Sequence, residues 1–555
     1  MTKAPNATEL TLGRRNFFVL ASGLAATSVL AGCGGGASSG SAAGTEFTGS
    51  IQELLPNLIP HDVAMPDIEG VDGSVPGFTS IPEEFVPSVA ETPGRGSSFT
   101  AMTPLWSNVP PGKDSNEYMQ EVDAAIGADF QFNITDGNTY NEKLQAVLAS
   151  PQNIPDFVTV QSGGMPNRFE EALEANFEDL TPHLAGDAVA KYPNLAALPT
   201  EMWSCCVFGG RLYGLPYASD IIGNTVYYRS DIADELGVSM EFSDAAEFLE
   251  VLKEVTDPGA NRWAVNDLAN GAAVHTIFGT PPDWVKRDGA LVHRYETEEY
   301  RAALDFQSQV FAAGVVHPDS VAGNSQQGRQ RFISGQVLIT GDGVGGWLST
   351  LRQARPENPE FEMAPIPAFN GAGGDPVYWK SAPSNLFTFV KKSDDPSRIE
   401  EQLALADYFA APFGSSEFAL LEYGVEGVHH TRDEDGVFHL TEQGQREVVR
   451  TYTWISRSIR VATEAQFDGY VDGMTSWMAS IMPFAEEPLG FGRTIMEPSE
   501  FASLSTPFDD LESDIARGRR PLSDLDAALE NWRTSGGDRM RDHYAEIFDS
   551  LEDAE

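Results

Sequence analysis

The chain is poor in cysteine, in basic residues and in long apolar runs. Its 555 residues include three cysteines and 36 Lys or Arg against 82 Asp or Glu, which gives a formal net charge of −46. Three cysteines exclude a disulfide-rich scaffold and a four-cysteine zinc site. Phosphate binding needs clustered positive charge, so the acidic balance argues against nucleic acid as a partner and against broad docking on anionic lipid. Hydrophobic residues still make up 41%, enough for large cores.

The first 33 residues have the pattern of an export signal. Arg14-Arg15 precedes an apolar run, 19–31, that is shorter than the roughly 20 residues of a membrane span, and the pair resembles a twin-arginine signal. The run ends in Leu30-Ala31-Gly32-Cys33, which resembles a bacterial lipobox, although an ordinary signal with an incidental cysteine is the alternative. We therefore expect removal of 1–32, lipidation of Cys33, and a protein held on the extracytoplasmic face of the cell membrane by its lipid anchor alone.

A tether is expected between Cys33 and the folded body. Residues 34–50 are nearly all Gly, Ser, Ala and Thr, the composition of a flexible linker. Residues 51–97 are rich in Pro and Gly with scattered apolar positions. We interpret 33–97 as the lipidated end and a tether, whose second part is an irregular arm that is laid on the surface or left mobile.

The body begins near Ser98 with alternating strand and helix patterns. Strand patterns cover 99–105, 130–134 and 157–160, and apolar residues at helical spacing cover 115–127 and the region of 144–148. This order predicts parallel strands joined by right-handed crossovers. Ligands of such sheets bind beyond the carboxyl ends of the strands. That rule favours Trp106 and Asn108 after the first strand, and Gln161 and Ser162 after the third.

A second α/β region follows. Its expected strands cover 212–217, 225–228 and 337–340, and its expected helices cover 230–236, 243–256 and 298–313. A glycine-rich run, 341–346, follows the last strand and leads to Trp347, which we place at the mouth of a site. The run does not match G-x-G-x-x-G and lacks the Lys-Ser/Thr of a phosphate loop, which argues against a nucleotide.

Several segments together resemble one family. They are 140–144 through 155–158, Gly210–Pro216 with Val226–Asp231, Phe332–Val337 followed by Trp347, Gly424–His429, and the tail from Asp524 to Tyr544. Each is weak alone, but in this order, after a lipobox, they resemble bacterial extracellular solute-binding proteins of the family 1 type. The branch is that of oligosaccharide- and aldouronate-type lipoproteins.

The resemblance implies an α/β fold of two lobes, like periplasmic binding proteins, with a hinge and an interlobe cleft. Such a protein closes on its ligand and delivers it to the transmembrane subunits of an ABC permease. We expect no enzymatic activity, no cofactor, no metal and a monomer. The predicted lobes are 98–216 plus 367–424, and 217–366 plus 425–555. The crossings are placed near Tyr217, near 365–367 and near 423–424.

The expected ligand is a carbohydrate, an oligosaccharide. Aromatic rings stack on the apolar faces of a pyranose, and polar side chains pair with its hydroxyl rim. In the family, the tryptophan in the position of Trp347 stacks on sugar. The candidate ligand-binding residues are Trp347, Trp106, Asn108, Asp220, Gln161, Ser162, Trp379 and Trp284. Trp203 is expected to pack, and Glu426 either orders its loop or touches sugar.

Other interpretations stay open at this stage. The same fold binding a peptide or a polyamine is the nearest alternative, followed by an exported glycan-active enzyme and by a structural or adhesive lipoprotein. Cys205 and Cys206 are adjacent and are interpreted as two buried free thiols. His429, His430 and His439 lack metal-ligand spacing, and a hairpin around 433–436 explains their segment.

Overall fold

The structure is a computed structural model that describes residues 51–554 except Asp62, Ser107, Asn167, 268–271 and Asp435. The predicted signal peptide, the lipidation of Cys33 and the tether up to residue 50 lie outside the described residues. All the described elements belong to one unit of the chain, Glu46–Glu555.

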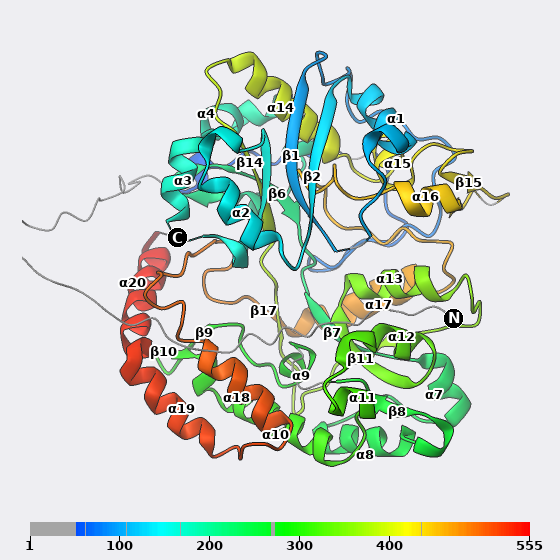
Figure 1. The fold of residues 1–555 in the computed structure, drawn as a ribbon, viewed down its shortest axis with the longest axis vertical. Helices are drawn as coiled ribbons and strands as arrows, with labels where there is room; N and C mark the ends of the chain where they lie inside the picture. Colours follow the sequence, from blue (N-terminus) through cyan, green and yellow to red (C-terminus); the bar gives the residue numbers. More distant parts are fainter. Residues whose placement is uncertain are drawn as a thin grey trace, which may run out of the picture. The chain divides into compact units, whose positions relative to one another are not determined.

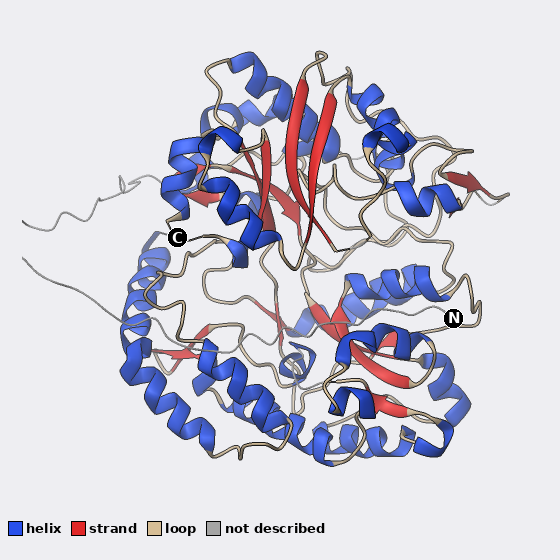
Figure 2. Cartoon of the chain, viewed as in Figure 1, coloured by secondary structure: helices blue, strands red, loops and turns tan. Residues whose placement is uncertain are grey.

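The first sheet is built on the predicted parallel strands. Its order is β2 (Asp129–Asp136), β1 (Ser98–Leu105), β3 (Phe157–Gln161), β14 (Ser384–Val390) and β6 (Gly214–Ala218). β1 pairs in parallel with both β2 and β3, as the β-α-β-α-β pattern predicted, whereas β14 is antiparallel to β3 and β6. Figure 1 shows β1 and β2 side by side in blue. Helices flank this sheet and the second sheet (Figure 2).

Helices around the first sheet form where the sequence is amphipathic and capped. In α1 (Glu117–Ile126), Tyr118, Val122 and Ile126 are fully buried, and Asn116 caps the helix by accepting from the Met119 N–H. These three residues belong to the first core, the largest buried cluster of this half. The other helices of this region are α2 (Tyr140–Leu148), α3 (Phe169–Asn176), α4 (Thr181–Leu184), α5 (Pro193–Ala196), α6 (Thr200–Ser204), α14 (Pro396–Phe409) and α15 (Ser416–Tyr423), beside the hairpin of β4 (Val207–Phe208) and β5 (Arg211–Leu212).

The second sheet has its own core. Its order is β12 (Ala364–Pro365), β7 (Asn224–Tyr228), β11 (Val337–Gly343) and β8 (Trp263–Val265). Phe248, Leu252 and Val255 of one helix are fully buried in this core. The helices here are α7 (Ser230–Leu236), α8 (Ala245–Val255), α9 (Ala272–Ile277), α10 (Glu298–Ala312), α11 (Pro318–Val321), α12 (Gly328–Ile333) and α13 (Gly345–Ala354). Asp244 caps α8, because its side chain accepts from the Ala246 and Glu247 N–H groups.

The C-terminal part adds helices to the second sheet's side. α17 (Tyr470–Ile481) packs with Trp347 and Tyr227 in one buried cluster. The hairpin of β9 (Trp284–Arg287) and β10 (Ala290–His293) forms another cluster with α18 (Thr506–Ala516), α19 (Asp524–Trp532) and α20 (Asp538–Ala554). Figure 1 shows α20, in red, beside this hairpin. The short strands β13 (Tyr378–Trp379) and β17 (Ala485–Glu486) pair in parallel.

The proline-rich arm, 51–97, is folded onto the body. Near its start, the Ile59 N–H donates to Ala196 O at 2.8 Å, and Leu55 is buried in the first core. Further on, the Phe78 N–H donates to Ala462 O at 2.8 Å, and Val75 joins the buried cluster of α17. The arm then returns, where the Ser88 N–H donates to the Glu417 carboxylate at 2.9 Å. Of the two alternatives left by the sequence, the surface-laid arm is the one observed.

After the arm, between residues 98 and 554, the chain passes between the two sheets at three places, two of them later than the sequence suggested. The first passage, 219–223, joins β6 to β7 beside the predicted Tyr217. The second follows Trp379, because Phe369 and Tyr378 still pack in buried clusters on the second sheet's side. The third follows Ile455, because Tyr452 and Ile455 are buried in the first core.

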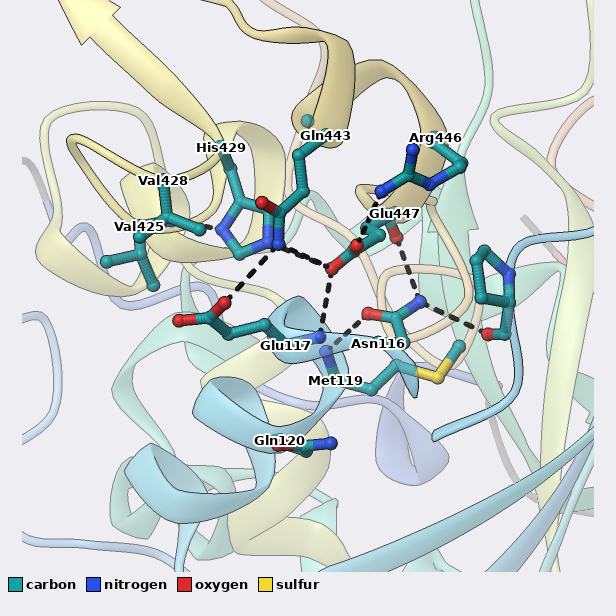
Figure 3. Close-up of polar contacts among 12 residues, drawn as sticks. Asn116, Glu117, Met119, Gln120, Val425, Val428, His429, Gln443, Arg446 and Glu447 are labelled. Carbon is teal, nitrogen blue, oxygen red and sulfur yellow. Dashed lines mark hydrogen bonds and ion pairs between the residues drawn. The ribbon is translucent and has the colours of Figure 1, made fainter. Parts of the chain in front are cut away.

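A buried polar cluster explains the late third passage. The Glu447 carboxylate, at the end of α16 (Glu442–Glu447), accepts from the Glu117 N–H at 2.9 Å and lies 3.4 Å from His429 Nε2. His429 Nδ1 accepts from the Val425 N–H, so that nitrogen is unprotonated and Nε2 is the donor toward Glu447. Figure 3 shows these contacts converging on Glu447. They hold 425–447, including the hairpin of β15 (His430–Arg432) and β16 (Phe438–Leu440), against α1.

Candidate ligand-binding site

A cavity of about 410 Å³ lies where segments of both sheets meet. Trp106, directly after β1, contributes from the first sheet. One face of α13 contributes from the second sheet, and the segment 448–464, which contains the third passage, completes the lining. We call this space the arginine cavity, because Arg352, Arg450, Arg457 and Arg460 line it.

An aromatic wall closes one side of the arginine cavity. Trp454 stacks on Tyr217 with ring centroids 4.7 Å apart and planes at 28°. Trp106 meets Trp454 edge to face at 5.5 Å and is 46% exposed. The loop after β2 touches Trp106 at Gly137, where a Cβ atom would lie 2.2 Å from the indole. Glycine at 137 therefore lets the indole take this position, half in water and half against Trp454.

The cavity's charged groups are held in place by one another. The Arg352 Nη2 donates to Glu464 at 3.1 Å, and Glu422 lies 3.7 Å from Arg450 and 3.5 Å from Arg457. Burial alone would raise the pKa of Glu422, but the positive charges of Arg450, Arg457 and Arg352 outweigh burial and hold that pKa below its ordinary value. Glu422 is therefore ionised at neutral pH.

The first passage is tied to the same cavity. Arg460 Nη1 lies 2.6 Å from both carboxylate oxygens of Asp220, and Arg457 donates to the Tyr217 hydroxyl at 2.7 Å. Asp220, a predicted site residue, thus positions an arginine of the cavity. The chain around 217–220 and the segment 457–460 run together there, so the first and third passages form one linked pair.

A second cavity, of about 620 Å³, surrounds Trp379. We call it the Trp379 cavity. The Trp379 Nε1–H donates to Gly279 O at 2.9 Å, which fixes the indole. Burial and the nearby Arg294 lower the pKa of His275 to about 3, so this histidine is neutral at physiological pH. The charged residues of the lining are Arg294, Lys380 and Arg493 opposite Asp283, Asp509 and Glu512.

The remaining predicted residues lie outside both cavities' linings. Trp347 is 4% exposed and packs on Tyr227 and Tyr470, so it does not stand at the mouth that we expected; with Leu351 it borders a separate cavity of about 470 Å³. The reason is helical spacing in α13, because Gly345, Leu348, Ser349 and Arg352 share the face toward the arginine cavity and Trp347 belongs to another face. Trp284 is 2% exposed and packs against His293 and Tyr544.

The predicted polar ligand-binding residues are exposed or partly exposed. Asn108 and Ser162 are exposed, and Gln161 is partly exposed at the end of β3. Glu426 is exposed and forms a backbone bridge with His430. Trp203 is fully buried in the first core, as expected.

The cysteines and histidines considered in the sequence analysis are buried or contact other protein groups. Cys205 and Cys206 are buried free thiols, which confirms that interpretation. His430 Nδ1 lies 2.9 Å from Tyr423 O, and His439 Nε2 lies 2.8 Å from Asp433. In the described part of the chain no group of three or more His, Cys, Asp or Glu is arranged to hold a metal ion. No described helix combines the length and the apolar character that crossing a membrane requires.

Two solved structures have a similar fold. The N-glycan transport solute binding protein NgtS from Streptococcus pneumoniae is similar with a TM-score of 0.60 and 15% identity, over 82% of this chain and 98% of that chain. The alginate-binding protein AlgQ2 is similar with a TM-score of 0.60 and 14% identity, over 82% and 98%. The chain folds as a two-lobe solute-binding protein. The fold class that we expected from the sequence is therefore confirmed.

Two sequence relatives of the chain come from Bacillus subtilis (strain 168). The polygalacturonan/rhamnogalacturonan-binding protein YtcQ is 22% identical over 468 residues, which cover 80% of this chain and 90% of that protein. The lipoprotein LipO is 21% identical over 490 residues, 82% and 93% of the two chains. No family model matches the chain. The resemblance to extracellular solute-binding proteins is nonetheless confirmed by these relatives together with the fold.

Most of the arginine cavity was not predicted from the sequence. Trp454 and the arginines of 450–460 were not among the candidates, since they follow no strand and the rule about strand ends does not reach them. The amino-acid composition of one stretch could have indicated these arginines. The stretch 446–460 contains four arginines and a single acidic residue, in a chain where acids outnumber bases by more than two to one.

Proposed function

We propose that the protein captures an oligosaccharide outside the cytoplasmic membrane and delivers it to an ABC permease, without catalysis. The arginine cavity carries this proposal, because it combines an exposed indole, a stacked aromatic pair and many N–H donors where the two lobes meet. The relatives support it, since YtcQ is named for binding polygalacturonan and rhamnogalacturonan, AlgQ2 for alginate and NgtS for N-glycan transport.

The chemistry of the cavity suits a sugar. The exposed side of Trp106 offers a flat apolar surface for the C–H face of a pyranose, and Trp454 supports it from behind. Hydroxyl groups of a bound sugar would replace their lost water contacts with the guanidinium N–H groups of the lining, because an unpaired buried hydroxyl costs about 1–3 kcal/mol. Since the lining comes from both lobes and from the passages between them, closure about 217–223 would complete the enclosure.

Binding without hydrolysis agrees with the state of the acids. A glycosidase needs one protonated carboxylic acid beside a second carboxylate. Glu422 has a lowered pKa, which is the wrong direction for a general acid, and Glu464 is engaged by Arg352. The two acids of this lining therefore act as partners for the arginines.

We extend the proposal to the lipid anchor. The lipobox-like Leu30–Cys33 sequence and the similarity to the lipoprotein LipO support lipidation of Cys33 after twin-arginine export. Cys33→Ser should move the protein from the membrane fraction into the medium or the soluble extracytoplasmic fraction. Arg14→Lys with Arg15→Lys should keep the precursor in the cytoplasm. Membrane association of the Cys33→Ser variant would contradict the anchor without affecting the sugar-binding proposal.

The experiment that tests the function is thermal unfolding of the purified chain against mono- and oligosaccharides, polyamines and peptides. A ligand at 100 times its dissociation constant should stabilise the native state by about 2.7 kcal/mol. Trp106→Ala should lose that shift, while Trp263→Ala, a partly exposed tryptophan on β8 outside the cavity lining, should keep it. A shift with polyamines or peptides and none with sugars would overturn the proposed ligand class and leave the fold untouched.

A further inference from the structure

The proline-rich arm runs from the lobe of the first sheet to the lobe of the second sheet and back. Its early part is bonded to the first lobe through the Ile59 N–H. Residues 68–78 then lie against the second lobe, where Val75 is buried in the cluster of α17. The arm is bonded to the first lobe again through the Val86 N–H. We call residues 68–78 the hinge loop, because here the arm reaches the passages between the lobes.

The hinge loop is bonded to the end of the third passage. The Phe78 N–H donates to Ala462 O at 2.8 Å, and the Ala462 N–H donates to Pro76 O at 2.9 Å. Ala462 is buried in the cluster of α17 and lies two residues after Arg460, which pairs with Asp220 of the first passage. The loop therefore adds a backbone pair close to the ion pair that joins the first and third passages.

The hinge loop also fits closely against α17 and the first passage. At Gly77, a Cβ atom would lie 2.8 Å from Thr475 Cγ2 and 2.9 Å from Val471 Cγ1, both on α17. At Gly73, a Cβ atom would lie 3.2 Å from Ile221 Cδ1, which belongs to the first passage. Glycine at 77 permits this close approach, and a larger side chain there would push the loop and α17 apart.

Phe78 is held by both lobes at once. Its N–H is bonded to Ala462 of the second lobe, and its ring packs on Phe413 of the first lobe, with centroids 4.4 Å apart and planes at 50°. Phe78 is 6% exposed and Phe413 is 4% exposed, so the contact between the two rings is buried. A rotation of one lobe against the other changes the separation of Ala462 and Phe413, and Phe78 then loses one of its two contacts.

Resting on the proposed function, in which closure about 217–223 encloses the sugar, we propose that the hinge loop is a brace that limits how far the two lobes open. Lobes that are already held near their bound arrangement lose less conformational freedom on binding, so the brace preserves affinity. None of residues 68–78 belongs to the described lining of the arginine cavity. Changes in the loop therefore act on the motion of the lobes and leave the sugar contacts in place.

The test is to measure the distance between the lobes in the full chain without ligand, by double electron–electron resonance. Spin labels are attached at Glu142→Cys on α2 and Glu254→Cys on α8, two exposed positions, in a Cys33→Ser background. The native thiols Cys205 and Cys206 are buried, which keeps them from being labelled. With the loop unchanged, we expect one narrow distance distribution.

Two variants release opposite ends of the brace. Gly77→Val separates the loop from α17, and Phe78→Ala keeps the backbone pair with Ala462 but removes the ring from Phe413. Each variant should broaden the distribution and add a population at longer distances. Because the brace needs both of its ends, the double variant should be no broader than the broader single variant, whereas two independent losses of packing would add.

Gly112→Val is the matched control. Gly112 is exposed, a Cβ atom there meets nothing within 4 Å, and its φ of −62° suits valine. This variant should keep the narrow distribution, and melting curves verify that each variant is folded. An unchanged loop that gives a distribution as broad as the two variants, or variants as narrow as the unchanged loop, would overturn the inference.

The measurement uses no ligand, so its failure is separate from a failure of the proposed function. Variants that leave the distance between the lobes unchanged would remove the brace and leave the oligosaccharide function standing. Absence of any response to sugars in the unfolding panel would overturn the function and leave the measured restraint on the lobes as it is.

Discussion

Trp454 lies face to face with Tyr217, with ring centroids 4.7 Å apart and planes at 28°. Tyr217 belongs to the last strand before the first passage between the lobes, and Trp454 to the segment before the third passage. The pair therefore joins the two connections about which the proposed closure would occur, and the edge of Trp106 extends it to the cavity surface.

Truncating this pair should weaken both stability and binding. Trp454→Ala removes the stacked ring and the support of Trp106, and we expect a loss of about 2 kcal/mol, roughly half the cost at a fully buried site. Urea unfolding measures it. Trp454→Phe should recover most of the stability because it keeps a ring on Tyr217. A Trp454→Ala variant as stable as the wild type would show that the stack contributes nothing.

Asp407 should make the protein less stable as the pH rises. Burial, with the charge of Glu417, raises the Asp407 pKa to about 7, although the N–H groups of Leu195 and Asn194 donate to it. The folded state therefore retains a proton that the unfolded chain, with a pKa near 3.8, has released. The stability that this retained proton contributes is fully present below about pH 4. As the pH rises to about 7 the contribution is lost, and the free energy of unfolding falls by a few kcal/mol in all.

The variant that isolates this effect is Asp407→Asn. Both backbone N–H groups donate to the same oxygen, Oδ1, at 2.8 and 2.9 Å, and an asparagine oxygen accepts them equally well. Urea unfolding of both proteins at pH 5 and pH 8 should give a larger pH difference for the wild type than for the variant. Equal differences would mean that Asp407 does not titrate in this range.

The ion pair between Asp220 and Arg460 should be strongly coupled. Both side chains are about four-fifths buried, so removing either leaves a charge with a poor partner. We expect Asp220→Asn to destabilise by about 1–3 kcal/mol and a double-mutant cycle with Arg460→Met to give a coupling energy of similar size. Additive effects of the two single changes would contradict a direct pair.

The cluster around Glu447 should hold the segment 425–447 in place. Burial alone would raise the Glu447 pKa, but donors from Gln443, Glu117 and His429 and the nearby Arg446 outweigh burial and lower it. Its stabilising contribution is thus present above the unfolded pKa of about 4.5 and is lost as the pH falls below it. In Glu447→Gln, hydrogen exchange should accelerate across 425–447 at pH 7. Unchanged exchange there, with the same global stability, would show that other contacts hold the segment.

The sequence predicted the periodic elements well and the cavity only in part. The parallel β1, β2 and β3, helix α1 and the end of α7 at Gly237 follow from local apolar spacing and capping, and all are observed. Trp347 was placed wrongly, at the mouth of a site. Local sequence does not reveal which face of α13 turns toward the cavity, and Trp347 lies on another face of that helix. The late third passage depended on His429 and Glu447 meeting α1 from about 300 residues away, a contact that no local pattern encodes.

The folded arm also bears on the proposed lipid anchor. With the lipid proposed at Cys33, the chain from that residue to Ile51, which packs against the first core, spans at most about 60 Å at full extension. A tether that ran free to Ser98 would reach more than about 200 Å. If Cys33 is lipidated as proposed, attachment of the arm to the body would keep the two lobes within that distance of the membrane and would raise their effective concentration at a permease in the same bilayer.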